Sequence, residues 1–184
     1  MIRLGSNSQT RADILKAHNI EFIQNGGTFD EDAITTKDPK EFVIKATLGK
    51  YKELLEKYGY EDMPLLVCDT VISCENKLLR KAKDKEDARY MLELQSNNET
   101  SIISCMIFKS KETYLFDVST TTYIFDEFKK EDLDKYINSG LCMGKAGAIM
   151  VEGFCKPYIK KVNGFESTAM GLCVEKLIPF LPNK

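Results

Sequence analysis

The 184-residue chain has the composition of an ordinary globular domain, with 43% apolar and 29% charged residues. Its net charge of −2 and its isoelectric point of about 5.6 argue against bulk nucleic-acid binding, which usually needs a basic surface. No apolar stretch approaches the roughly 20 residues that cross a bilayer, and no apolar leader opens the chain. We therefore expect one domain over residues 1–184, no membrane contact and a cytoplasmic location.

The cysteines point to the same reducing compartment. None of the six forms a CxxC pair, and most lie in apolar segments, so we expect buried, reduced thiols. The only histidine, His18, falls on a predicted helix, which leaves no set of ligands for zinc.

Hydrophobic periodicity predicts strands and helices that mix without strict alternation. Strands are expected over residues 1–6, 20–24, 64–73, 77–79, 101–108, 113–120, 121–128 and 156–164. Helices are expected over residues 11–19, 39–60, 85–95 and 130–140, with a last one that begins at Ser167. This pattern indicates an α/β (α+β) domain with a mixed central β-sheet flanked by helices.

Helix ends and apolar stripes can also be predicted. Asp84 is expected to cap the 85–95 helix, and Gly140 to end the 130–140 helix. The inner face of the 39–60 helix is expected to be the stripe Ile44, Leu48, Tyr51, Leu55 and Tyr58. The last helix is expected to bury Met170, Val174, Leu177 and Leu181.

Asp69 is the residue that most needs an explanation. It interrupts the apolar segment "LLVCDTVIS", which reads as a buried strand. A buried carboxylate is costly unless it is paired or binds a metal ion. We therefore expect Asp69 to hold a cation or a water molecule at the edge of the sheet.

Other segments supply groups that suit phosphate and metal ions. Ser6, Ser8 and Arg11 precede or open a helix, and such a helix start binds anions well. Lys50, Lys81 and Lys145 lie at or near the ends of other predicted elements. The polar loop that follows residue 24 carries an acidic cluster, in which Glu31 is a candidate metal ligand with Asp69.

Two phosphatase patterns are incomplete here. Cys74 and Arg80 have the C-x5-R spacing of cysteine phosphatases, but no glycine lies between them and no histidine precedes the cysteine. Val71 stands where phosphatases of the haloacid-dehalogenase type carry a second aspartate. A phosphatase that releases orthophosphate therefore remains a weaker alternative.

The order of the motifs resembles the Maf family over nearly the whole chain. "LGSNSQTRADIL" is similar to the family's opening LASxSPRRxxLL, and Asp30 and Glu31 match its acidic pair. "CDTVI" resembles ADTVV, and "LRKAKDKEDARYML" resembles L-G-K-P with its following helix. Lys50 matches a lysine near the end of a helix, "KAGAIMVEG" resembles K-A-G-a-Y-g-I-Q-G, and "GFESTAMGLC" resembles GxxxNVVGLP.

The resemblance implies a sheet-based fold with a cleft between two lobes, usually in a homodimer. It implies metal-dependent hydrolysis of nucleoside triphosphates to the monophosphate and pyrophosphate, with Mg²⁺ or Mn²⁺. The substrates would be pyrimidine nucleotides, such as dTTP or UTP, or modified nucleotides, with a role in nucleotide housecleaning and cell-division arrest. The expected site has Asp69 as the catalytic group, Glu31 and Asp69 as metal ligands, and Ser6, Ser8, Arg11, Lys50, Thr70, Lys81, Lys145 and Glu152 around the substrate.

Departures from the family pattern leave a second interpretation open. Thr10 stands where the family often has a second arginine, and Glu152 replaces a glutamine. Cys173 replaces a proline, and Glu99 replaces a histidine. The alternative is a nucleotide-binding regulator of septum formation with little turnover and a cell-division protein as partner. Aromatic residues such as Phe125 and Phe128 are candidates for an exposed dimer contact.

Overall fold

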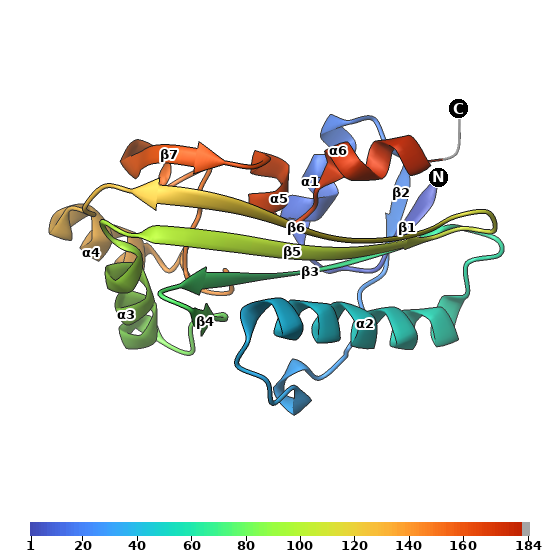
Figure 1. Ribbon diagram of the computed structural model, residues 1–184, viewed down its shortest axis with the longest axis horizontal. Helices are drawn as coiled ribbons and strands as arrows, with labels where there is room; N and C mark the ends of the chain where they lie inside the picture. The colour runs from blue at the N-terminus through green and yellow to red at the C-terminus, as the bar shows by residue number, and fades with distance from the viewer. Residues whose placement is uncertain (182–184) are drawn as a thin grey trace.

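The computed structural model describes residues 1–181 and is built on one mixed, seven-stranded sheet (Figure 1). The strand order is β2-β1-β3-β5-β6-β7, and β4 pairs with β3 away from this path. β1 is parallel to β2 and to β3, whereas the other pairings are antiparallel. The strands are β1 (Ile2–Leu4), β2 (Phe22–Gln24), β3 (Leu65–Cys74), β4 (Lys77–Leu79), β5 (Glu99–Lys109), β6 (Tyr114–Phe125) and β7 (Ile159–Asn163).

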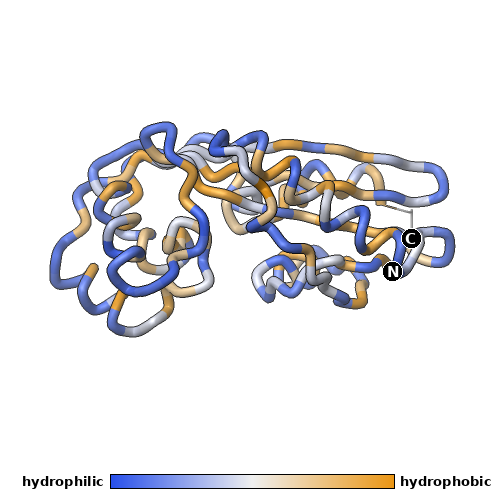
Figure 2. Tube along the Cα trace, turned by 90° about the horizontal axis from the view of Figure 1, so that it is seen from below, coloured by the Kyte–Doolittle hydropathy of each residue, from blue (hydrophilic) through white to orange (hydrophobic). Residues whose placement is uncertain are grey.

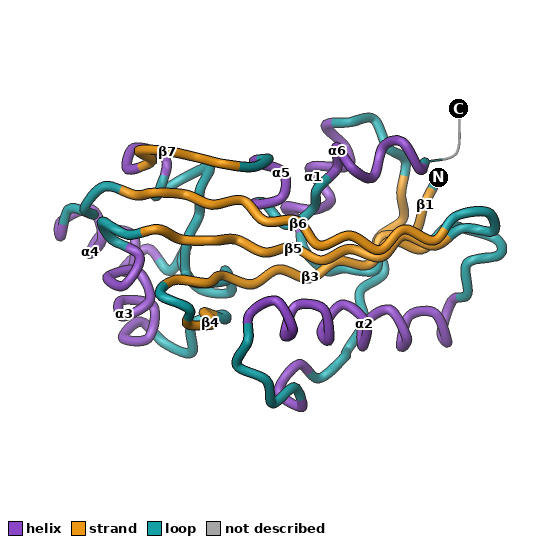
Figure 3. Tube along the Cα trace, viewed as in Figure 1, coloured by secondary structure: helices purple, strands orange, loops and turns teal. Residues whose placement is uncertain are grey.

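Helices cover both faces of this sheet. α2 runs along one face, α1 and α6 lie on the opposite face, and α3 and α4 lie together at the far end (Figures 1 and 3). The helices are α1 (Gln9–Ala17), α2 (Pro39–Tyr58), α3 (Lys85–Gln95), α4 (Lys130–Ser139), α5 (Glu166–Ala169) and α6 (Val174–Leu177), with the 3-10 turns η1 (Glu31–Ala33), η2 (Lys156–Tyr158) and η3 (Ile178–Phe180). None of the helices within residues 1–181 has the length and apolar character needed to cross a membrane.

Several local predictions are confirmed. Asp84 caps α3 by accepting a hydrogen bond from the backbone N–H of Asp87, and Gly140 ends α4 in the left-handed conformation. Residues 77–79 pair with the end of β3 as a hairpin. The cysteines, all buried and free, are Cys68, Cys74, Cys105, Cys142, Cys155 and Cys173.

The buried apolar residues form separate clusters along the sheet. One lies at the α3 and α4 end and includes Ile72, Ile102 and Phe125. Another lies around β1, α1 and α6 and includes Leu4 and Phe108. Many of the outer loops are hydrophilic, and orange segments run through the interior (Figure 2). The predicted mixed sheet flanked by helices is therefore confirmed.

The prediction of two strands over residues 113–120 and 121–128 is wrong. β6 is one strand, and its residues Ser119–Thr122 pair without interruption with Ser104–Ser101 of β5. Serine is frequent in turns, but the threonines are β-branched and no glycine or proline breaks the segment. The chain therefore continues as strand where a turn was expected.

The predicted buried face of α2 is shifted. Phe42, Val43, Ala46, Thr47 and Leu54 are the buried residues, whereas the predicted stripe is only partly buried. Thr47 allows the shift, because its hydroxyl donates to the carbonyl of Val43 at 2.8 Å and can therefore be buried against β5. Small residues at positions 46 and 47 let the helix approach the sheet closely.

The last helix is not continuous. Its expected span divides into α5 and α6, because Gly171 has a φ of +106° that a helix cannot accommodate. The predicted cap is also wrong, since Ser167 lies inside α5 and its hydroxyl bonds to Glu175 instead. Likewise, the first part of the predicted 156–164 strand is the turn η2.

The aromatic residues proposed for a dimer contact are buried. Phe125 is 1% exposed and Phe128 is 5% exposed. Phe125 stacks against Tyr123 with ring centroids 5.6 Å apart, and Phe128 lies 5.1 Å from Tyr158. These rings form the core at the α4 end, so neither is available to a second copy.

Candidate active site

The sheet opens on one side of β3 where Asp69 lies. β1 pairs with β3 only at Leu65 and Leu66, and β4 pairs with it only from Ile72 onward. Within the described part of the chain, the stretch between these pairings has no strand partner on that side. β3 is an interior strand, so the expected position at an edge holds only locally: Asp69 lies in the middle of this opening.

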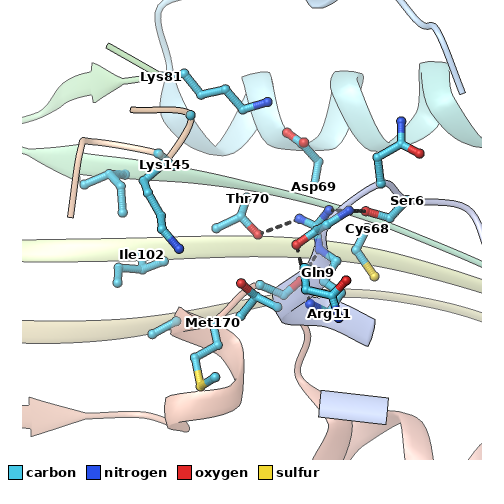
Figure 4. Close-up of a pocket in the computed structure, with 18 of the residues that line it drawn as sticks. Ser6, Gln9, Arg11, Cys68, Asp69, Thr70, Lys81, Ile102, Lys145 and Met170 are labelled. Atoms are coloured by element: carbon cyan, nitrogen blue, oxygen red, sulfur yellow. Dashed lines mark hydrogen bonds between the residues drawn. The ribbon is translucent and has the colours of Figure 1, made fainter. Parts of the chain in front are cut away.

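A cavity of about 670 Å³ lies at this opening (Figure 4). Its lining includes Asp69, Thr70 and Ile72 of β3. Segments far apart in the sequence meet around it, from the loop between β1 and α1 to the end of α5 and the residues that follow it. All the residues predicted for the site line this cavity: Ser6, Ser8, Arg11, Glu31, Lys50, Asp69, Thr70, Lys81, Lys145 and Glu152.

Lys50 joins the two candidate metal ligands. Its Nζ lies 2.6 Å from Oε1 of Glu31 and 2.6 Å from Oδ1 of Asp69. Asp69 is 7% exposed, and its second carboxylate oxygen, Oδ2, is buried and has no hydrogen-bond partner among residues 1–181. Burying a carboxylate oxygen without a hydrogen-bond partner costs free energy. A cation or a water molecule bound to Oδ2 would offset this cost.

The two carboxylates differ in acidity although they share Lys50. Burial raises the pKa of Asp69, and the nearby charge of Glu31 raises it further, against the opposing effects of Lys50 and Arg11. Burial also acts to raise the pKa of Glu31, but the hydrogen bond and charge of Lys50, with Lys81 and Arg80, lower it overall. Neighbouring acids with pKa values moved in opposite directions are suited to different roles.

Arg11 holds together three parts of the fold. α1 begins here because Ser8 caps it, accepting from the backbone N–H of Arg11 at 3.4 Å. The guanidinium donates to Ser6 Oγ at 2.9 Å, to Thr70 Oγ1 at 3.1 Å and to the carbonyl of Gly171 at 2.8 Å (Figure 4). Its positive charge therefore faces the cavity in a fixed orientation, supported by neutral oxygens.

Backbone pairing brings the two lysines of the far wall together. Lys81 forms an isolated antiparallel bridge with Ala146, and the N–H of Gly147 donates to the carbonyl of Arg80 at 2.9 Å. Gly147 has a φ of +57°, and a Cβ there would lie 2.8 Å from the Ile72 side chain. This tight turn is what places Lys145 and Lys81 on the same cavity (Figure 4).

The comparison with known proteins identifies the family. The family model described as "Maf-like protein" matches residues 1–183. The chain belongs to the Maf family. It is 52% identical over 179 residues to a protein of a Nitratiruptor species, in an alignment that covers 96% of each chain.

More distant Maf-type relatives agree with this assignment. A Helicobacter pylori (strain J99) protein is 38% identical over 175 residues, or 95% of this chain and 92% of its own. A Campylobacter jejuni subsp. doylei protein is 36% identical over 183 residues, or 98% and 100%. All three relatives are named "Nucleoside triphosphate pyrophosphatase", which is the enzyme class expected from the sequence.

Sequence reasoning missed the apolar wall of the Maf cavity. Ile72, Ile102, Ile149, Val151 and Met170 also line it. Most of them are buried core residues by pattern and by position, so no sequence signal separates them from the rest of the core. The cavity therefore has a charged part and an apolar part, which suits a ligand with a phosphate chain and a flat ring.

The residues present fit a divalent cation whose remaining ligands would come from the substrate and water. Within residues 1–181, no group of three or more His, Cys, Asp and Glu side chains is arranged to hold a metal ion. Asp69 and Glu31 do provide carboxylate oxygens on the cavity, one of them without a partner. Mg²⁺ is typically bound by one or two carboxylates together with phosphates and water. Asp69 and Glu31 are thus the residues that could hold it.

Proposed function

We propose that the chain hydrolyses nucleoside triphosphates between the α and β phosphates, releasing a nucleoside monophosphate and pyrophosphate. The observation that carries this proposal is the meeting of basic groups, a buried carboxylate and an apolar wall on one cavity. The names of the Nitratiruptor, Helicobacter and Campylobacter relatives support the same reaction.

The basic residues would bind the triphosphate. Lys81 and Lys145 approach from the bridged loops, and Arg11 and Ser6 from the start of α1. Lysine and arginine charges that are already in place stabilise the negative charge that moves onto the leaving pyrophosphate. The hydroxyl and backbone N–H groups near Ser8 would add hydrogen bonds, because helix starts attract anions.

Asp69 would accept the proton of the attacking water. Burial raises its pKa toward the working range of a general base, while its hydrogen bond to Lys50 holds one oxygen in place. A bound Mg²⁺ or Mn²⁺, held by Asp69 and Glu31, would supply charge neutralisation and orientation of the phosphates. Lys50 fixes both carboxylates before substrate enters.

The finer features of the proposal come from the family. We propose pyrimidine nucleotides such as dTTP or UTP, or modified nucleotides, as substrates. We also propose a cytoplasmic homodimer that clears unwanted nucleotides and acts in the arrest of cell division. The apolar wall accepts a base but does not by itself distinguish among bases, since a few hydrogen bonds would decide.

A nucleotide-binding regulator with little turnover is the second candidate. One observation favours it: the three nitrogens of the Arg11 guanidinium already donate to protein oxygens. Thr10, which also lines the cavity, brings no charge to replace a second arginine. Such a site would bind phosphates less strongly in the transition state.

Product analysis with a matched variant tests the proposal. Purified protein is incubated with Mg²⁺ and a panel of common and modified triphosphates, and pyrophosphate and orthophosphate are assayed separately. Pyrophosphate release is expected from the wild type and from Asp134→Asn, a surface aspartate paired with Arg89, but not from Asp69→Asn. Orthophosphate release would indicate a phosphatase, and nucleotide binding without release would favour the regulator.

A further inference from the structure

Arg80 lies beside the candidate site but does not line the main cavity. It follows β4 directly, and its backbone carbonyl accepts the hydrogen bond from Gly147 that fixes the lysine loops. Its side chain borders a second cavity of about 30 Å³, which shares Glu31 and Asp69 with the first. Arg80 therefore contacts the acidic residues from the side away from the main cavity, where it would not touch a substrate.

The Arg80 guanidinium pairs with two carboxylates of the acidic loop and lies over an aromatic ring of α2. Nη1 lies 2.8 Å from Oδ1 of Asp32, and Nη2 lies 3.6 Å from Oε2 of Glu31. The guanidinium carbon lies 4.9 Å from the ring centroid of Phe42, a buried residue of α2. Arg80 thus connects the loop that carries Glu31 both to α2 and to the hairpin that carries Lys81.

The turn that carries Glu31 is held mainly through its side chains, whereas the loop on either side of it is anchored by Thr28, which bonds to Glu53, and by Ile34, which packs against the Phe42 cluster. None of the residues Glu31–Ala33 is buried. Asp32 is 83% exposed at its side chain, so its pair with Arg80 contributes little by itself. The Glu31 side chain is 24% exposed, and the planar guanidinium is fixed on the Phe42 ring, which reduces the entropy lost in forming the pairs.

We infer that Arg80 is a positioning residue: it holds Glu31 in the orientation that faces Lys50 and Asp69. Lys50 holds Oε1 of Glu31 from the cavity side, and Arg80 approaches Oε2 from the other side. The carboxylate is thereby fixed at both oxygens. The expected effect of Arg80 on turnover rests on the proposed function. Its expected effect on the order of the loop is independent of that function.

Hydrogen exchange of the free protein tests the effect on the loop. Arg80→Gln is expected to increase amide exchange over Glu31–Ala33 several-fold, because this turn loses the ion pairs that Glu31 and Asp32 make with Arg80. Arg89→Gln is the matched control, since Arg89 also pairs with carboxylates and is 39% exposed against 38% for Arg80. It should leave exchange in the loop unchanged. Equal exchange in wild type and Arg80→Gln would overturn the inference.

Kinetics with Mg²⁺ and the best triphosphate test the effect on Glu31. Arg80→Gln should lower kcat roughly tenfold and leave KM for the nucleotide within about threefold, because misplacement of a group costs rate more than binding. Arg80→Lys keeps the charge but not the planar group that reaches Asp32 and Glu31 together, so it should recover only part of the loss. A rise in KM alone, or full recovery with lysine, would contradict a positioning role for the guanidinium. If the wild type releases no pyrophosphate, the proposed function fails, and the hydrogen-exchange result still decides the inference.

Discussion

Asp69 combines a cost in stability with a role in function. Its pKa is raised by burial, so the folded state binds a proton more tightly than the unfolded chain does. The ionised carboxylate therefore reduces the free energy of unfolding as pH rises from the unfolded pKa through the folded one. Above the folded pKa the fold carries this penalty in full, which is typical of a residue retained for chemistry.

Asp69→Asn should separate these two roles. We expect pyrophosphate release to fall about 10²–10⁴-fold, the usual contribution of a general base. At neutral pH the melting temperature should rise by about 2–4 °C, on the order of 1 kcal/mol. Thermal melts of wild type and variant across pH should converge at acid pH, where Asp69 is protonated. A variant that melts lower at every pH would contradict this account.

Lys50 influences the pKa of both carboxylates. Its hydrogen bonds and charge act to lower the pKa of Glu31 and of Asp69. Lys50→Gln should therefore move the acid limb of the kcat/KM profile to higher pH, since the pKa values of both carboxylates rise when this positive charge is removed. Other positive charges remain in the variant and limit the rise in pKa: Lys81 and Arg80 act on Glu31, and Arg11 acts on Asp69. An unchanged acid limb would show that neither carboxylate controls it.

At the scale of elements, turns decide where the lysines lie. Gly147→Ala puts a Cβ at 2.8 Å from Ile72 and a side chain at a φ of +57°. We expect a loss of about 1–3 kcal/mol in unfolding free energy and a raised KM, because the turn that carries Lys145 must shift. Denaturant unfolding and steady-state kinetics measure both.

Gly144→Ala is the control for this turn. Gly144 has a φ of +76°, but apart from its chain neighbours no atom of residues 1–181 would lie within 4 Å of a Cβ there. The substitution brings the backbone strain without the collision, so the expected loss is about 1 kcal/mol with KM nearly unchanged. Equal effects of the two substitutions would mean that strain alone matters and that Ile72 does not hold the loop.

Elements with local signals could be predicted from the sequence, and those shaped by distant contacts could not. Asp84 marks the start of α3 because an aspartate before a helical pattern is a local signal. By contrast, the buried face of α2 depends on how closely Thr47 approaches β5, and the continuity of β6 depends on its pairing with β5. The break at Gly171 was missed because the apolar spacing continues past it.

The site follows the same rule. Polar residues such as Ser6, Asp69 and Lys81 could be predicted because they match ordered motifs, and Asp69 also interrupts an apolar strand. Ile102 and Met170 could not, since an apolar cavity wall has the same composition as a core. Arg80 was noticed only in an incomplete phosphatase pattern, because its contacts with Asp32 cross nearly fifty positions of the chain.

At the scale of the whole molecule, the cavity separates hydrophobic clusters that long strands connect. β3 and β5 run through both regions, with Leu66 and Phe108 in one cluster and Ile72 and Ile102 in the other. Segments from both regions contribute side chains to the cavity, Arg11 of α1 from one end and Lys145 from the other. A ligand that spans the cavity would therefore link the two regions and stabilise the folded chain.

An uncleavable nucleotide should reveal this linkage as a rise in melting temperature. With Mg²⁺ and an α,β-methylene triphosphate at about 100 times its Kd, the stabilisation is about 2.7 kcal/mol, or ~5–10 °C for a chain of this size. EDTA should reduce the shift, because Asp69 and Glu31 would then repel the phosphates. Lys81→Gln should also reduce it, whereas Lys77→Gln should not, since Lys77 lies on β4 beside Glu75 and outside the cavity. If no α,β-methylene triphosphate, whatever its base, raises the melting temperature in the presence of Mg²⁺, the proposal that this cavity binds nucleotides is wrong. An equal shift in both lysine variants would place the phosphates elsewhere.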